Sequence, residues 1–140
     1  MYLLDTNVVS ELRKASRAEP AVRNWASGQS PGVVFISTMS LMELEIGLLR
    51  IARRDAPQGE QLRLWLEQIV LAQFEGRILG IDAAIARRCA HLHVPDPRPE
   101  RDALIAATAL THGLTVVTRN TADFAPMGVP LLNPWQPPGA

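Results

Sequence analysis

The sequence lacks several features that would assign its class at once. It has a single cysteine, Cys89, which excludes an intramolecular disulfide and suits a reducing cytoplasm. No apolar run approaches the ~18 residues that a membrane helix needs. The start of the chain has neither a basic segment nor a signal-peptide cleavage pattern. We therefore expect a cytoplasmic protein that is not inserted in a membrane.

An excess of charge of one sign is also missing. The 14 basic and 14 acidic residues give a formal net charge of zero, whereas a nucleic-acid-binding protein usually carries a basic surplus. The balance conceals asymmetry if several acids gather in one pocket, because the remaining surface is then net positive.

Several catalytic signatures are absent. The sequence contains neither a Walker phosphate loop nor a GxGxxG motif, and no serine or cysteine nucleophile with a histidine base is evident. The three histidines, at positions 91, 93 and 112, do not form the i, i+4 pair of a zinc-binding helix. We interpret all three as structural or exposed.

What is present describes one ordinary domain. The chain has 140 residues, of which 47% are apolar and 20% charged, enough to bury a sizeable core. We place the domain at 1–134 and a Pro-rich tail at 135–140, because the tail can continue neither a helix nor a central strand. The segment 57–59, Pro-Gln-Gly, is interpreted as a loop.

Short apolar segments alternate with helical patterns along the chain. Buried strands are predicted at 2–4, 33–37, 77–81 and 115–118. Helices are predicted at 8–14, 19–28, from Thr38 or Ser40 through Leu49, 61–74, 83–93 and 99–112. Strands that alternate with helices indicate an α/β protein with a parallel sheet covered by helices.

Four acids lie just after the predicted strands or in the first turns of helices: Asp5, Glu43, Asp102 and Asp123. Ligands of open α/β sheets bind outside the carboxyl ends of the strands, where these acids would meet. Asp102 strengthens the expectation because it shares a helix face with Ala106 and Ala109. A carboxylate on a packed face is costly unless it is paired or binds a cation.

Each acid also has a purely structural alternative. Asp5 would help to start the first helix, and Asp102 would complement a helix dipole. Glu43 would complete a capping box with Ser40. Asp123 would be a turn or cap residue. Spacing alone does not decide between these roles and a shared site.

If the four acids do converge, they require a cation. Four carboxylates in one pocket repel one another strongly, and hard divalent ions such as Mg²⁺ or Mn²⁺ take oxygen ligands. Such an ion polarises a phosphate and generates hydroxide from bound water. The acids therefore predict a metal site that acts on a phosphate ester.

The same residues resemble a known family. The motifs are Leu4-Asp5-Thr6-Asn7, Ile36-Ser37 with Glu43-Leu44 and Gly47, Asp102 through Ala109, and Val117-Thr118-Arg119-Asn120 with Asp123-Phe124. In this order they resemble PIN-domain proteins, most closely the VapC and FitB type of toxin ribonuclease. The resemblance spans Met1 to about Pro134.

The resemblance implies a PIN-like three-layer α/β/α fold with a central, mainly parallel sheet of four to five strands. It also implies a Mg²⁺-dependent endoribonuclease that is the toxin of a type II toxin–antitoxin system. Its partners would be RNA, a small VapB-like antitoxin and a second copy in a homodimer. By position, the acidic cluster is Asp5, Glu43, Asp102 and Asp123, and the polar supporting residues are Asn7, Thr118 and Asn120.

Two other interpretations stay open. A metal phosphohydrolase of the DxD type needs an acid two residues after Asp5, and position 7 is Asn7 instead. A non-catalytic binding module would keep the fold without turnover, but the complete set of acids disfavours it.

RNA binding would need cations near the acids. Without the four acids, the chain has 14 basic and 10 (14 − 4) acidic residues, a surplus of four. Arg119 is the favoured phosphate contact because it lies between Thr118 and Asn120. Further candidates follow the first helix: Arg13, Lys14 and Arg17.

Overall fold

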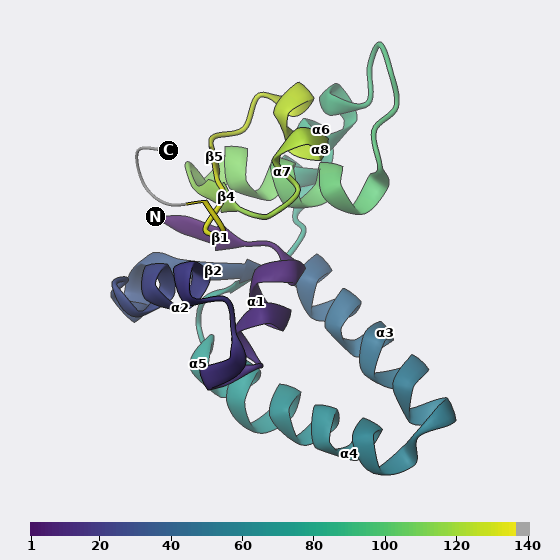
Figure 1. Ribbon diagram of the computed structural model, residues 1–140. Helices are drawn as coiled ribbons and strands as arrows, with labels where there is room; N and C mark the ends of the chain where they lie inside the picture. The colour runs from purple at the N-terminus through teal and green to yellow at the C-terminus, as the bar shows by residue number, and fades with distance from the viewer. Residues whose placement is uncertain (137–140) are drawn as a thin grey trace.

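A five-stranded parallel sheet forms the centre of the computed structural model, which describes residues 1–136 (Figure 1). The strands are β1 (Tyr2–Leu4), β2 (Val34–Ser37), β3 (Ile78–Leu79), β4 (Thr115–Val117) and β5 (Leu131–Leu132). Their order is β3-β2-β1-β4-β5, and each neighbouring pair is parallel. The α/β class and the number of strands are confirmed, although β5 was not among the predicted strands. Residues 137–140 of the predicted tail lie outside the described residues.

Helices cover both faces of the sheet. One group comprises α1 (Thr6–Leu12), α2 (Pro20–Ser27), α3 (Thr38–Arg54), α4 (Ala56–Trp65) and α5 (Leu71–Gln73), with a π-helical segment at Leu66–Val70. The other comprises α6 (Ala83–Leu92), α7 (Glu100–His112) and α8 (Thr121–Phe124). Short 3₁₀ turns occur at Ala15–Arg17, Pro31–Val33 and Ala125–Met127. Figure 1 shows α6, α7 and α8 gathered beside β4 and β5, while α3 and α4 form a long hairpin beyond β2.

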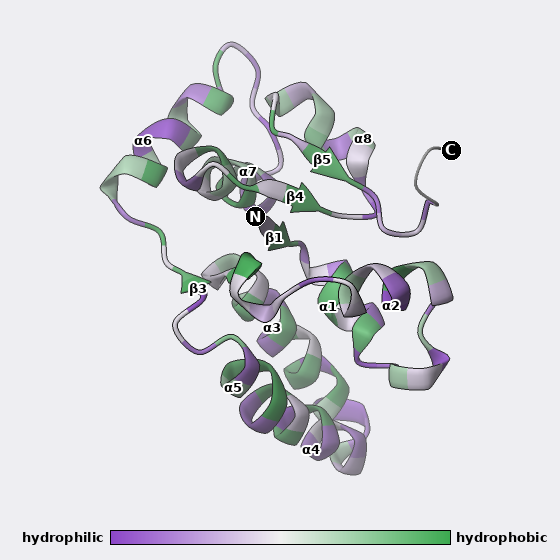
Figure 2. Cartoon of the chain, turned by 90° about the vertical axis from the view of Figure 1, so that its left-hand side faces the viewer, coloured by the Kyte–Doolittle hydropathy of each residue, from purple (hydrophilic) through white to green (hydrophobic). Residues whose placement is uncertain are grey.

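Two apolar cores lie between the sheet and its helices, one on each face of the sheet. Successive residues of the central strand alternate between them: Leu3 packs with α6 and α7, whereas Leu4 packs with α1 and α3. On β4, Val116 and Val117 divide in the same way. Because both faces are covered, the strands are continuous apolar runs. Figure 2 shows these apolar strands between helices that have one polar and one apolar side.

The predicted loop at 57–59 is wrong, because these residues lie in the first turn of α4. The Asp55 side chain accepts a hydrogen bond from the Gln58 backbone N–H at 3.1 Å and caps the helix. Proline is tolerated at the start of a helix, where its missing N–H would have no partner. The helix predicted at 61–74 therefore begins five residues earlier, at Ala56.

Other predicted boundaries agree with the structure. Asp82 caps α6, and its Oδ1 accepts a hydrogen bond from the Ile85 backbone N–H at 2.9 Å. Gly113 ends α7 with a φ of 69°, a left-handed conformation that glycine adopts at little cost. No helix among residues 1–136 is both long and apolar enough to span a membrane.

The strand order positions the site. After β1, the chain adds β2 and β3 on one side of it, and then β4 and β5 on the other. Such a reversal opens a crevice at the carboxyl ends of the strands. Pairing continues one residue beyond β1, because the Asp5 backbone N–H donates to the Val117 carbonyl at 2.9 Å. The residues that follow β1 and β4 are therefore neighbours.

Candidate active site at the carboxyl ends of β1 and β4

Asp5 lies at the centre of this crevice, with only 5% of its surface exposed. Its Oδ1 accepts a hydrogen bond from the Thr6 backbone N–H at 2.8 Å and thereby caps α1. Its Oδ2 accepts from Thr118 Oγ1 at 2.8 Å and from Asn7 Nδ2 at 3.4 Å. Burial raises the pKa of Asp5 above its usual value, while the bonds from Thr118 and Thr6 oppose that rise. Asp5 therefore caps the helix and also faces the crevice.

Thr118 and Asn7 hold this carboxylate in place. Thr118 is fully buried, and its Oγ1 accepts hydrogen bonds from Asn7 Nδ2 at 3.3 Å and from the Asn120 backbone N–H at 3.0 Å. Asn7 Oδ1 accepts from the Arg119 backbone N–H at 3.3 Å. The polar residues predicted after β1 and β4 thus form one connected network, to which Asn120 contributes its backbone.

Glu43 faces α1 instead of the start of its own helix. Its Oε1 accepts a hydrogen bond from Thr6 Oγ1 at 2.8 Å, and its Oε2 lies 3.9 Å from a guanidinium nitrogen of Arg101. The capping-box alternative is wrong because α3 begins earlier and is capped by Ser37. Ser40 is fully buried within the helix.

Asp102 completes a group of interacting charges. It is half-buried in the first turn of α7. Burial, followed by the negative charges of Asp5, Asp123 and Glu43, raises the pKa of Asp102 to about 6. The charges of Glu43 and Asp123 also raise the pKa of Asp5. Glu43 and Asp123 therefore lie close enough to Asp5 and Asp102 for their charges to act on both, and the four predicted acids gather at one site.

Asp123 lies at the edge of this group. It is exposed in α8 and does not line the hollow described below, although its charge acts on both Asp5 and Asp102. Its backbone N–H donates to the Asn120 carbonyl at 3.1 Å, which closes the turn into α8.

A hollow of about 520 Å³ contains Asp5, Glu43 and Asp102 in its wall. Four further residues of this wall were not predicted: Thr6, Ser10, Glu11 and Trp135. Glu11 lies four residues after Asn7 on α1, so the face of that helix was a signal that could have found it. Trp135 follows a strand too short to be recognised, and no local signal indicated it.

Three cations also line the hollow. Arg13, Lys14 and Arg119 are in its wall, whereas Arg17 is not. Lys14 Nζ lies 3.1 Å from Glu11 Oε1 and forms an ion pair with it. Within residues 1–136, neither Arg13 nor Arg119 forms a salt bridge.

The donor set suits a hard, hydrated cation. All the acidic side chains of the hollow offer oxygen, which Mg²⁺ prefers. In the part of the chain that the structure describes, however, no three His, Cys, Asp or Glu side chains converge on a point where they could hold one ion. Mg²⁺ commonly binds through one or two carboxylates and keeps several waters. The residues therefore fit a hydrated Mg²⁺ better than an ion enclosed by four carboxylates.

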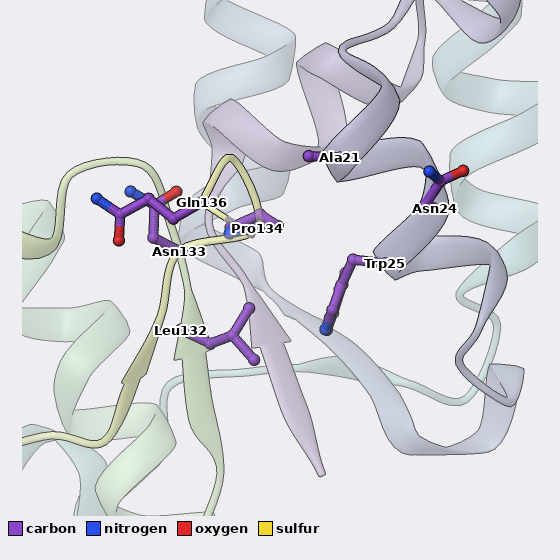
Figure 3. A pocket seen from close by; sticks show the side chains of 7 residues that line it. All are labelled: Ala21, Asn24, Trp25, Leu132, Asn133, Pro134 and Gln136. Atoms are coloured by element: carbon purple, nitrogen blue, oxygen red, sulfur yellow. The ribbon is translucent and has the colours of Figure 1, made fainter. Parts of the chain in front are cut away.

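A second hollow, of about 550 Å³, lies between α2 and the segment after β5. Figure 3 shows Trp25 on one side of it, opposite Leu132 and Pro134. All the residues that line it are uncharged. It therefore offers no titratable side chain for acid–base chemistry.

Comparison with known proteins agrees with this geometry. The family model described as PIN domain matches residues 2–128. The chain therefore belongs to the PIN-domain family, in the group that includes the VapC and FitB proteins.

Three relatives illustrate the match. The VapC ribonuclease Y4jK of Sinorhizobium fredii is 35% identical over 98% of this chain and 99% of its own length. The toxin FitB of Neisseria gonorrhoeae is 36% identical over 96% of this chain and 99% of its own. The crystal structure of FitAcB from Neisseria gonorrhoeae has a TM-score of 0.88 at 33% identity, and covers 97% of this chain and 99% of that chain. The PIN-like fold expected from the sequence is confirmed.

Proposed function

We propose that the chain is a metal-dependent endoribonuclease and the toxin of a type II toxin–antitoxin pair. The observation that carries this proposal is the placement of Asp5 and Asp102, two carboxylates with raised pKa values in one hollow at the switch point of the sheet. Burial is the main cause of these raised pKa values and the neighbouring negative charges add to it, and a bound divalent cation would favour the ionised carboxylates against both. Two of the relatives described above, a VapC ribonuclease and the toxin FitB, support the same reaction and role by their names.

Asp5 and Asp102 would hold Mg²⁺ or Mn²⁺ directly, with Asp123 and Glu43 contributing a ligand or an oriented water. The bound ion would polarise the phosphate and lower the pKa of a water molecule. Thr118 fixes the orientation of the Asp5 carboxylate. Thr6 holds Glu43 through Oε1, while Oε2 makes no hydrogen bond to Thr6 and lies 3.9 Å from a guanidinium nitrogen of Arg101.

The partner would be a small antitoxin that covers the hollow. A carboxylate cluster without a cation attracts a guanidinium, which can bond it bidentately. An apolar groove that includes Leu44, Leu48 and Trp65 adjoins the hollow and shares Thr6 and Glu43 with it. A partner helix in this groove could place an arginine among the acids. The toxin itself would be a homodimer, which light scattering can measure.

The decisive experiment is cleavage of a total-RNA pool by the purified chain with Mg²⁺, with Mn²⁺ and with chelator, followed by end mapping. We expect cleavage only with a metal, and loss to background in Asp5→Asn. Glu43→Gln keeps the hydrogen bond from Thr6 and should fold normally, yet lose roughly 10- to 100-fold in rate if Glu43 orients a ligand or water.

Glu75→Gln is the matched control, because Glu75 is an exposed acid outside the hollow. Expression of the wild type alone should arrest growth, and Asp5→Asn should relieve the arrest. Folded wild-type protein that is harmless in cells and cleaves no RNA would replace this proposal with a non-catalytic binding module.

A further inference from the structure

Two arginines that line the acidic hollow each lie against a tryptophan ring. The Arg119 guanidinium carbon is 5.2 Å from the centroid of Trp135, and that of Arg13 is 6.0 Å from the centroid of Trp65. Both distances are within the range of a cation–π interaction. The same arrangement therefore occurs twice around one site.

The two pairs flank the hollow from different parts of the fold. Trp65 is the last residue of α4, which packs against α3 on the β2 side of the sheet. Trp135 follows β5, at the opposite edge of the sheet. Figure 1 shows α4 and β5 on opposite sides of α1, whose last residue, Leu12, directly precedes Arg13. The two arginines of the hollow's wall are thus held by segments from different parts of the fold.

Each tryptophan keeps its arginine available for an anion. A flexible guanidinium beside several carboxylates would be expected to form an ion pair, yet neither Arg13 nor Arg119 does so within residues 1–136. The indole ring gives each guanidinium a contact other than an ion pair. For Arg119, the bond from its backbone N–H to Asn7 Oδ1 fixes the start of the side chain as well.

Trp135 is itself anchored. Its backbone N–H donates to Asn133 Oδ1 at 2.9 Å, Pro134 before it is buried, and its half-buried ring packs at the edge of the core on the α1 side of the sheet. A ring held in this way can limit where the Arg119 guanidinium moves.

We propose that Trp65 and Trp135 are positioning residues that hold Arg13 and Arg119 on two sides of the hollow, where each binds a phosphate flanking the reacting one. The inference rests on the proposed ribonuclease function and narrows its substrate. The RNA strand must cross the hollow and extend beyond it in both directions. A dinucleotide is too short to reach both arginines.

The first test measures RNA binding as a function of salt. The probe is a fluorescein-labelled single-stranded oligouridylate, bound to the cleavage-inactive Asp102→Asn protein and followed by anisotropy. Removing one phosphate contact should make the slope of log K against log salt shallower by about 0.7. We expect this change for Arg13→Ala and for Arg119→Ala, and about twice the change when both are replaced. Arg17→Ala, outside the hollow, should leave the slope unchanged.

The second test separates positioning from packing. Trp135→Leu and Trp65→Leu keep apolar bulk but remove the ring face, whereas the phenylalanine variants keep a face. We expect each leucine variant to bind the oligouridylate about two- to fivefold more weakly, and each phenylalanine variant to retain most of the affinity. The loss of RNA affinity caused by each tryptophan-to-leucine substitution should vanish when the partner arginine has already been replaced by alanine.

The outcomes distinguish this inference from the function on which it rests. Wild-type protein that neither binds nor cleaves RNA overturns the ribonuclease proposal and this inference with it. RNA cleavage by the wild type, combined with unchanged salt slopes in both arginine variants, overturns this inference alone. This inference alone is also overturned if a tryptophan-to-leucine variant still weakens RNA binding when the partner arginine is alanine. It is likewise overturned if the wild type cleaves a uridylyl-uridine dinucleotide as efficiently as the longer strand.

Discussion

Asp5 shows how a single side chain serves the fold and the site together. Its Oδ1 caps α1, and its Oδ2 is held by Thr118 and Asn7. The first helix was predicted at 8–14, but it begins two residues earlier, at Thr6. Because α1 begins directly after β1, the carboxylate at the strand end reaches the first free N–H. The structural and functional interpretations of Asp5 are therefore compatible.

Asp102 should make stability depend on pH in a defined direction. Burial and the neighbouring acids raise its pKa from 3.8 to about 6, so the folded state keeps a proton that the unfolded chain releases between these values. Its contribution to the free energy of unfolding therefore falls as the pH rises through this window and stays low above it. Asp102→Asn should raise the melting temperature above the wild-type value at about pH 7.5, and by less at about pH 4.5.

The measurement is a pair of thermal melts in chelator for wild type and Asp102→Asn at each pH. Glu75→Gln controls for the loss of one negative charge elsewhere on the surface. If Asp102→Asn changed the melting temperature by the same amount at both pH values, the neighbouring acids would not be destabilising the ionised carboxylate of Asp102.

The α3–α4 hairpin shows how packing can override local sequence signals. Pro57 and Gly59 are typical turn residues, yet both lie in the first turn of α4. Gly59 is buried against Ala52 of α3, and an ideal Cβ at position 59 would lie 2.5 Å from the Ala52 Cβ and 2.6 Å from its Cα. Glycine at this position permits the two helices to approach each other.

Gly59→Ala should destabilise the protein although alanine is the better helix former. The clash should cost about 1–3 kcal/mol, which exceeds or matches the gain of about 1 kcal/mol in helix propensity. Gly47→Ala is the matched control, because Gly47 is a helical glycine of α3 with nothing within 4 Å of its ideal Cβ. The free energy of unfolding of Gly47→Ala should rise by about 0.5–1 kcal/mol. Urea unfolding measures the stability of both variants. Equal stabilisation by the two substitutions would contradict the close approach of α3 and α4 at Gly59.

The zero net charge of the molecule conceals an uneven distribution. Asp5, Glu43 and Asp102 share one hollow, and Asp123 adds its charge from the edge. The remaining chain carries a surplus of four basic residues (14 − 10). Fold and charge together therefore create an acidic hollow with cations along its wall, which the overall balance does not indicate.

A divalent cation should stabilise this molecule through the acids. Binding to the folded state alone adds RT ln(1 + [L]/Kd), about 1.4 kcal/mol at a tenfold excess over Kd. Mg²⁺ or Mn²⁺ should therefore raise the melting temperature of the wild type by an amount that follows, through this logarithm, from the Kd found by calorimetric titration. K⁺ at equal ionic strength is the control. Equal affinity of the wild type and Asp5→Asn for either divalent ion would contradict a site built on Asp5.

Local patterns in the sequence were sufficient for the main elements and for the acids. The apolar runs at 2–4, 33–37 and 115–118 predicted β1, β2 and β4, because burial on both faces leaves an uninterrupted apolar segment. The two-residue strand β5 was missed because Leu131–Leu132 is too short to show a pattern. Trp135, which follows it, was missed for the same reason.

Sequence alone established the α/β class and the order of the four acids, because strand burial and the position of an acid after a strand are local properties. Only the tertiary structure decided which groups meet. Glu43 turns to Thr6, 37 residues away, instead of Ser40. Asp123 stays at the edge of the hollow, and Arg119 meets Trp135. These contacts depend on how α1, α3, α8 and the segment after β5 are placed around the sheet, and no local spacing encodes that placement.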